Sequence, residues 1–269
     1  MNLLDELMSI KTDGLFAVIL GASGSGKSRL LGTLPGKTLY LYGASESHGV
    51  ASAAQVNKDL LPIAWDRTKD PAGQIIEVPA EKLLKRIKDV LEPGTLTKLG
   101  VKFVVLDSWT ALAQDLKNTP QFKQRVIDPK SGKVNTFKET EALIELMSGV
   151  IRDLQTLNEA HKIDVATTLD LQIQAIGEDG TILESKPSLP TFGVARSIVQ
   201  AFADILVLGR IGEKRTPTLQ NFAMVASSSV DRETKVVCKY IEFNPRLRGV
   251  ASIPETMPAD LKEVLKLKG

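Results

Sequence analysis

The stretch LFAVILGASGSGKS, residues 15–28, decides the fold. Its first part, Leu15 to Leu20, is a continuous apolar run that predicts a strand buried on both faces. Its second part, Gly21 to Ser28, has the pattern of Gly, four residues, Gly, Lys and Ser, and a helical segment follows it. A strand, a glycine-rich turn and a helix in this order predict a phosphate-binding loop in an α/β protein.

Each residue type in this loop has a chemical reason. Glycines let successive backbone amide groups point into one concavity, where they can hold phosphate oxygens. Lys27 is expected to reach the β- and γ-phosphates, and the hydroxyl of Ser28 to bind Mg²⁺. We therefore expect ATP and Mg²⁺ as cofactors. The residues expected to bind the nucleotide are Gly21, Ala22, Ser23, Gly24, Ser25, Gly26, Lys27, Ser28 and Arg29.

The rest of the chain alternates short apolar runs with segments of helical period, which predicts a mostly parallel central sheet with helices on both faces. Further strands are expected at 38–42, 75–78, 103–106, 164–176 and 205–211, and antiparallel strands at one edge from FAMVASSSV and VVCKYIEFNP. Helices are expected at 79–92, 109–116, 136–157 and 195–202. Pro79 should open the first of these helices, and Pro93-Gly94 should close it.

The chain shows no break in composition, so it is expected to form a single domain over 1–269. Its core should cover about 15–250, with a short N-terminal segment, 1–13, and a C-terminal helix, 258–268. The net charge of +2 gives no overall preference for an anionic partner. One cysteine, Cys238, excludes an intrachain disulfide, and two histidines are too few for a structural zinc cluster. No apolar run is long enough to span a membrane, so a cytoplasmic location is expected.

A second half of the nucleotide site is expected where FVVL ends abruptly on Asp107. An acid at the end of a buried strand can hold Mg²⁺ through water, so Ser28 and Asp107 form the expected metal site. An isolated Asp before Ser108 and a helical WTALAQDL could also cap that helix. The phosphate-binding loop favours the metal site.

The segments GASGSGKS, TLYLYGASESH, VVLDSWTAL and ATTLD together resemble the RecA-like P-loop ATPases, and among them the small phage ATPases of single-strand annealing or recombination. The resemblance covers about residues 15–211. It implies that Glu46, after the strand at 38–42, orients the attacking water. It also implies a polar sensor residue after the strand that follows the long helix. Thr168, Asp170 and Gln172 are available there, and Thr168 is the expected sensor.

The resemblance further implies basic residues that complete the site of a neighbouring subunit, for which NPRLRG offers Arg246 and Arg248. It places a DNA-binding loop in the polar stretch 117–138, which is expected to be exposed. Phe122 and Phe137 are the stacking candidates there, and a solvated charged loop is the alternative. The residues expected to contact single-stranded DNA are Lys117, Lys123, Arg125, Lys130, Lys133 and Lys138.

The leading hypothesis is therefore a self-assembling ATPase, a ring or filament, that acts on single-stranded DNA in recombination or annealing, in the host cytoplasm if it comes from a phage. A P-loop small-molecule kinase is one alternative, with Arg125 as a candidate lid residue. A nucleotide-gated assembly or packaging ATPase with a protein partner is another.

Overall fold

The computed structural model describes residues 14–128, 132–176, 182–187, 192–210, 222–225, 247–250 and 256–268. Of the sequence-based predictions, the N-terminal segment 1–13, the strand VVCKYIEFNP and the residues Lys130 and Arg246 lie outside the described residues. So do the side chains of Ala22 and Phe137.

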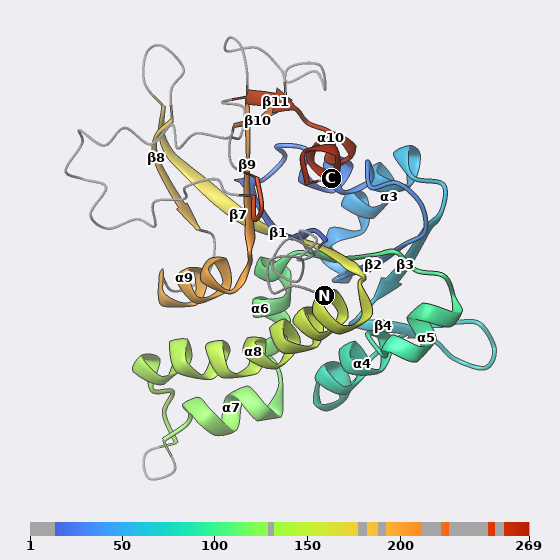
Figure 1. Ribbon diagram of the computed structural model, residues 1–269. Helices are drawn as coiled ribbons and strands as arrows, with labels where there is room; N and C mark the ends of the chain where they lie inside the picture. Colours follow the sequence, from blue (N-terminus) through green and yellow to red (C-terminus); the bar gives the residue numbers. More distant parts are fainter. Residues whose placement is uncertain are drawn as a thin grey trace, which may run out of the picture.

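Six parallel strands form the centre of the molecule (Figure 1), as the continuous apolar runs predicted. Their spatial order is β9-β1-β7-β6-β2-β3. The first strand is joined to β7 on one side and to β9 on the other, so the segment that precedes the phosphate-binding loop lies inside the sheet. The six strands are β1 (Phe16–Ala22), β2 (Thr38–Tyr42), β3 (Leu60–Ala64), β6 (Phe103–Asp107), β7 (Asp164–Ile176) and β9 (Asp204–Arg210).

Antiparallel strands extend this sheet beyond β9, as predicted for one edge. They are β10 (Phe222–Val225) and β11 (Thr256–Pro258), and β8 (Ile182–Pro187) pairs antiparallel with β7 away from the main row. A small separate hairpin consists of β4 (Arg67–Lys69) and β5 (Ile75–Glu77).

The third strand along the chain differs from the prediction. Residues 75–78 were expected as a strand of the alternating series, but β5 belongs to the separate hairpin, and Ile75 is 68% exposed. The sheet strand is β3, in the sequence LLPIA, which contains Pro62. Because β3 pairs with β2 alone, it is an edge strand, where a residue without an N–H group is tolerated.

Helices cover both faces of the sheet, as expected. Alternate residues of the strands pack into two buried apolar clusters, one under α4 to α9 and the other under α2, α3 and α10. In Figure 1 the helices α4 to α9 lie below the sheet, and α3 and α10 lie to its upper right. The helices are α2 (Lys27–Leu31), α3 (Ser47–Val56), α4 (Leu83–Val90), α5 (Pro93–Lys98), α6 (Trp109–Lys117), α7 (Pro120–Val126), α8 (Thr136–His161), α9 (Phe192–Ala201) and α10 (Leu261–Lys268), with short 3₁₀ turns η1 (Ala44–Glu46) and η2 (Ala80–Lys82).

One local prediction is incomplete, and another is wrong. Pro93-Gly94 does not only end a helix: it begins α5, because the carboxylate of Glu92 accepts hydrogen bonds from the N–H groups of Gly94 and Thr95. The stretch 117–138 is not one exposed loop, because α7 forms within it. Thr119 caps α7, and Phe122 is 4% exposed in the core, which removes it as a stacking candidate.

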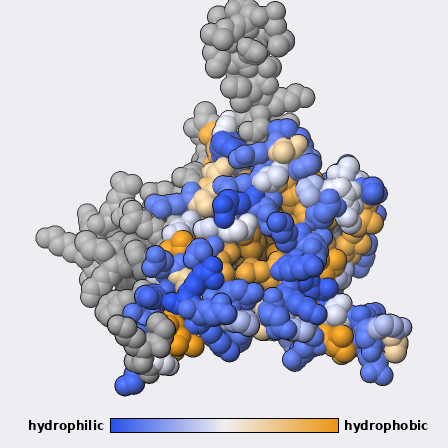
Figure 2. Space-filling view, turned by 90° about the horizontal axis from the view of Figure 1, so that it is seen from below, coloured by the Kyte–Doolittle hydropathy of each residue, from blue (hydrophilic) through white to orange (hydrophobic). Residues whose placement is uncertain are grey.

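The lower face of the molecule is largely hydrophilic, with hydrophobic patches between the polar side chains (Figure 2). In the part of the chain that the structure describes, no helix is both long and apolar enough to cross a membrane.

Candidate functional site

The carboxyl ends of β1, β2, β6 and β7 bring the predicted site residues to one edge of the sheet. Parallel strands point the same way, so the segments that follow them meet at the same edge. Strand register aligns Tyr42 with Asp107, and Gly21 with Asp170. Residues 21–28, which run from the end of β1 into the first turn of α2, have the P-loop sequence pattern and are called the P-loop below.

The P-loop has a backbone that glycine permits. Gly24 and Gly26 have φ angles of 72° and 94°, in the left-handed region that other residues avoid. A Cβ atom at either position would meet no other atom within 4 Å, so open space adjoins the backbone there. The Ser25 hydroxyl is buried and has no hydrogen-bond partner among the described residues. An orphaned donor beside an open glycine backbone fits a loop that receives an anion.

Lys27 is held within the site by two oxygens. Its ammonium group donates to the carbonyl of Gly21 at 3.1 Å and lies 2.5 Å from a carboxylate oxygen of Asp170. The Lys27 side chain is only 7% exposed. A buried ammonium group at the mouth of the P-loop can neutralise phosphate charge. Asp170, one of the three polar residues available for the sensor position, thus contacts Lys27.

Asp107 is surrounded by hydroxyl groups. Its carboxylate accepts hydrogen bonds from Ser28 Oγ at 2.8 Å, from the Tyr40 hydroxyl at 2.5 Å and from Thr168 Oγ1. Asp107 is 2% exposed, and the peptide bond between Asp107 and Ser108 is cis. Ser28 and Asp107, the expected metal ligands, are therefore in direct contact. Hydroxyl and carboxylate oxygens are the ligands that Mg²⁺ prefers, so these residues fit the ion.

The alternative in which Asp107 caps the following helix is wrong. Ser108 is the capping residue of α6, because its Oγ accepts a hydrogen bond from the N–H group of Ala111 at 3.2 Å. The Asp107 carboxylate is thereby left for the hydroxyl cluster. Thr168 donates a hydrogen bond to this carboxylate and so lies beside Asp107.

Glu46 ends the 3₁₀ turn that follows β2, on the same edge as Asp107. Partial burial raises the pKa of Glu46, and the negative charges of Asp107 and Asp170 raise it further, whereas Lys27 and a hydrogen bond with Ser108 lower it. A carboxylate with a raised pKa is a better proton acceptor for water at neutral pH. The position and the electrostatics suit the predicted role of orienting water.

Hydrogen bonds and close packing hold the turn that carries Glu46. Both carboxylate oxygens of Asp66 accept the N–H group of Ala44, at 3.0 and 3.1 Å. A Cβ atom on Gly43 would lie 2.9 Å from the ring of Trp65, and the Trp65 indole donates to Asp115 at 2.7 Å. Burial raises the pKa of Asp115. This packing leaves the turn little freedom.

The remaining nucleotide-loop residue, Arg29, points toward α3, where its guanidinium is 3.5 Å from the Gln55 side chain. Arg248 is exposed, and its N–H group donates to Asp204 at 2.7 Å. Asp204 is the first residue of β9 and is aligned with Ala17, whereas the P-loop follows the other end of β1. Arg248 therefore does not join the P-loop of its own chain.

The basic residues of 117–138 are only partly available to a partner. Lys117 pairs with Glu139 at 3.2 Å, and Arg125 makes a bidentate pair with Glu145, with both distances 2.8 Å. Each pair joins the segment to α8. Lys123, Lys133 and Lys138 are exposed.

Sequence reasoning missed Tyr40 and Gly49. Tyr40 lies in TLYLY, where an apolar run gives no sign that one hydroxyl meets an acid 67 positions away. Gly49 lets α3 approach the P-loop helix, because a Cβ atom there would be 2.5 Å from Ser28 Oγ. Only the tertiary contact between α2 and α3 creates this requirement.

Comparisons with known proteins do not identify a family: no protein-family model matches the chain, and no curated protein matches it.

Proposed function

We propose that this protein binds ATP with Mg²⁺ and hydrolyses it, as a RecA-like ATPase. One observation carries the proposal: Lys27, Ser28, Glu46 and Asp107 come from three separate segments of the chain and gather at one edge of the sheet. A glycine-rich turn of no chemical role would not require an acid with three hydroxyl partners beside it.

The proposed roles follow from the chemistry of each group. The P-loop N–H groups and Lys27 bind phosphate oxygens. Ser28 and Asp107 would hold Mg²⁺, which supplies positive charge against the phosphates. Glu46 orients the water that attacks the γ-phosphate, and its raised pKa helps it to accept a proton. Asp170 sets the position of Lys27 through their ion pair.

Self-assembly and action on single-stranded DNA belong to the same proposal and are supported by the resemblance of the sequence. Arg248 is exposed at the edge opposite its own P-loop. A guanidinium placed there can serve a P-loop only in a neighbouring subunit, which fits a ring or filament in which one chain completes the site of the next.

The test is ATP turnover and ATP binding by wild type, Lys27→Ala and Glu46→Gln, with and without single-stranded DNA. Glu46→Gln should bind ATP normally and lose at least about 100-fold in turnover, because the amide cannot act as a base. Lys27→Ala should weaken ATP binding itself. Glu159→Gln, a change of an exposed glutamate on α8, is the matched control and should behave as wild type. Turnover by Glu46→Gln at the wild-type rate would refute the assigned role, and the absence of ATP binding by wild type would refute the function.

A further inference from the structure

A groove lies between α8 and α9, which run side by side below the sheet (Figure 1). We call it the α8–α9 groove, and it has a volume of about 190 Å³. On α8 its lining extends from Ile144 to Gln155. Ile144 and Ala201 are apolar lining residues that remain partly exposed. The buried apolar lining residues are Met147, Ile151, Val194 and Ile198.

The size and the lining of the groove indicate what can occupy it. Small-molecule sites usually have volumes of about 300–1,000 Å³, so this groove is too small for an ordinary ligand. Among its described lining residues, Arg152 alone is charged. Apolar side chains at helical spacing are the usual occupants of an apolar groove on a protein surface. The α8–α9 groove therefore suits the apolar side of an amphipathic segment.

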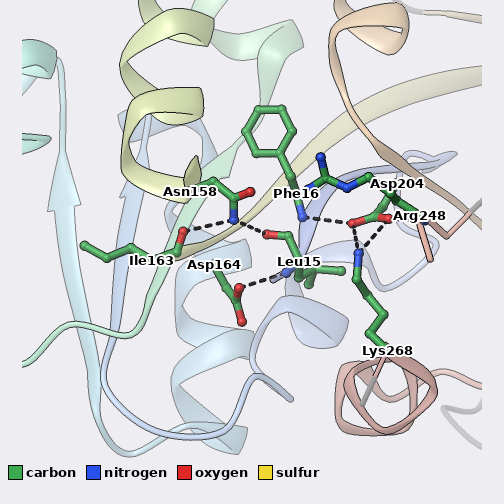
Figure 3. A network of polar contacts seen from close by, with 8 residues as sticks. All are labelled: Leu15, Phe16, Asn158, Ile163, Asp164, Asp204, Arg248 and Lys268. Atoms are coloured by element: carbon green, nitrogen blue, oxygen red, sulfur yellow. Dashed lines mark hydrogen bonds and ion pairs between the residues drawn. The ribbon is translucent and has the colours of Figure 1, made fainter. Parts of the chain in front are cut away.

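The groove ends where the first described stretch of the chain begins, at residue 14. On the side of α8, Asn158 lies one turn beyond the groove, and its side-chain amide donates to the carbonyl of Leu15 at 3.1 Å (Figure 3). On the side of α9, Phe202 directly follows the helix and stacks on Phe16, with ring centroids 4.5 Å apart. Both helices that form the groove are therefore fixed to the residues that follow segment 1–13.

Segment 1–13, MNLLDELMSIKTD, has the residue spacing that such a groove requires. Its apolar positions recur at intervals of three and four, which would place them on one side of a helix. In helical form, residues 3–10 would span about 10 Å, and the α8 lining of the groove spans about 16 Å. Residues 11–13 can bridge about 10 Å to Gly14. The segment is thus long enough to reach along the groove. Its apolar positions are Leu3, Leu4, Leu7, Met8 and Ile10.

We infer that segment 1–13 docks into the α8–α9 groove of its own chain, with Leu3, Leu7 and Ile10 against the apolar lining. Docking would remove apolar surface of both the segment and the groove from water. The groove of the same chain is the favoured host because residue 14 is held at its end, so a short tether keeps the segment at a high local concentration. The groove shares no described residue with the nucleotide site, so its occupant is independent of the proposed ATPase activity.

The first experiment measures the reactivity of a thiol placed in the groove. Ser148 lines the groove, so Ser148→Cys in a Cys238→Ser background gives one cysteine there. A chromogenic disulfide reagent reports the rate at which this thiol is modified. Adding Leu3→Ser/Leu7→Ser should raise the rate at least about tenfold, because a segment without its apolar anchors no longer covers the groove.

The second experiment establishes which chain supplies the segment. Leu4→Cys/Ser148→Cys, again with Cys238→Ser, is oxidised at low protein concentration and analysed by non-reducing electrophoresis. We expect a disulfide within one chain, which migrates as a monomer and changes its mobility on reduction. Leu4→Cys/Lys262→Cys is the matched control, because Lys262 is exposed on α10, which covers the other face of the sheet.

Asn2→Ser/Thr12→Ser changes polar positions of the same segment and should alter the thiol reactivity less than about twofold. Three results would overturn the inference: equal reactivity with and without Leu3→Ser/Leu7→Ser, disulfide-linked dimers in place of linked monomers, or no more linkage in the groove pair than in the α10 pair. Linked dimers would show that the segment occupies the groove of a second copy. The thermal unfolding temperature of each variant establishes that it is folded.

Discussion

A single hydroxyl, that of Tyr40, links an apolar strand to the candidate metal site. Tyr40 is fully buried, and burial followed by the nearby charge of Asp107 raises its pKa well above the ordinary value. The phenol therefore stays protonated and donates to the Asp107 carboxylate. This hydrogen bond orients an acid that is proposed to serve the metal, as groups behind metal ligands commonly do.

Replacing Tyr40 by Phe should weaken the Mg²⁺ dependence of ATP binding by about ten- to a hundredfold, because Asp107 loses a partner that orients it. Calorimetric titration of ATP at several Mg²⁺ concentrations measures this change. Tyr42→Phe is the matched control, since Tyr42 lies two residues along the same strand and is only partly buried. An unchanged Mg²⁺ dependence in Tyr40→Phe, with a normal unfolding temperature, would show that the hydrogen bond is structural only.

At the residue scale, the sequence could predict groups whose role is local. Lys27 and Ser28 follow from the P-loop pattern, and Asp107 follows from its place at the end of an apolar run. Tyr40, Gly49 and the pairing of Lys27 with Asp170 depend on which strands and helices become neighbours. No local pattern encodes those contacts.

Among the helices, α10 is attached by both apolar and ionic contacts. Leu261 and Val264 are fully buried, and Lys268 reaches Asp204, whose carboxylate also accepts the N–H groups of Phe16 and Arg248 (Figure 3). The side chains of Lys268 and Asp204 are 4% and 0% exposed. The last helix is thus joined to the first strand through one buried carboxylate.

Replacing Lys268 by Met should lower the free energy of unfolding by about 3–5 kcal/mol, because it leaves the buried Asp204 without its cation. Urea unfolding followed by circular dichroism measures the loss. Lys266→Met removes an exposed pair with Glu263 on the same helix and should leave the urea midpoint nearly unchanged, because solvent screens an exposed pair. Similar losses in the two variants would contradict the importance of the buried pair.

Elements with a strong hydrophobic period were predictable, and those shaped by packing were not. The long helix α8 and the strands β1, β2 and β6 were predicted close to their observed bounds. α7 was missed because polar and basic residues dominate its sequence, although Phe122 and Val126 bury one side of it. β3 was missed because Pro62 is acceptable only at a sheet edge, and the sequence does not state which strand is at the edge.

Across the whole molecule, the parallel sheet separates two chemically different edges. The carboxyl ends of the strands carry the P-loop, Glu46 and Asp107, and the amino end of β9 carries Asp204, which pairs with Lys268. The α/β class and the layers on both faces were predictable from alternation alone, whereas the pairing of Asp204 with Lys268 was not, because the two residues are 64 positions apart in the sequence. The proposed nucleotide site and the buried ion pair thus lie at opposite ends of the sheet.

The central claim is that Asp107 and the P-loop together hold ATP with its magnesium. Its most direct test is calorimetric titration of ATP into wild type and Asp107→Asn, with Mg²⁺ and with excess chelator. The account predicts that Mg²⁺ tightens ATP binding to wild type at least about tenfold and that Asp107→Asn loses most of this gain. ATP binding by wild type that does not depend on Mg²⁺, or an equal magnesium effect in Asp107→Asn, would contradict it.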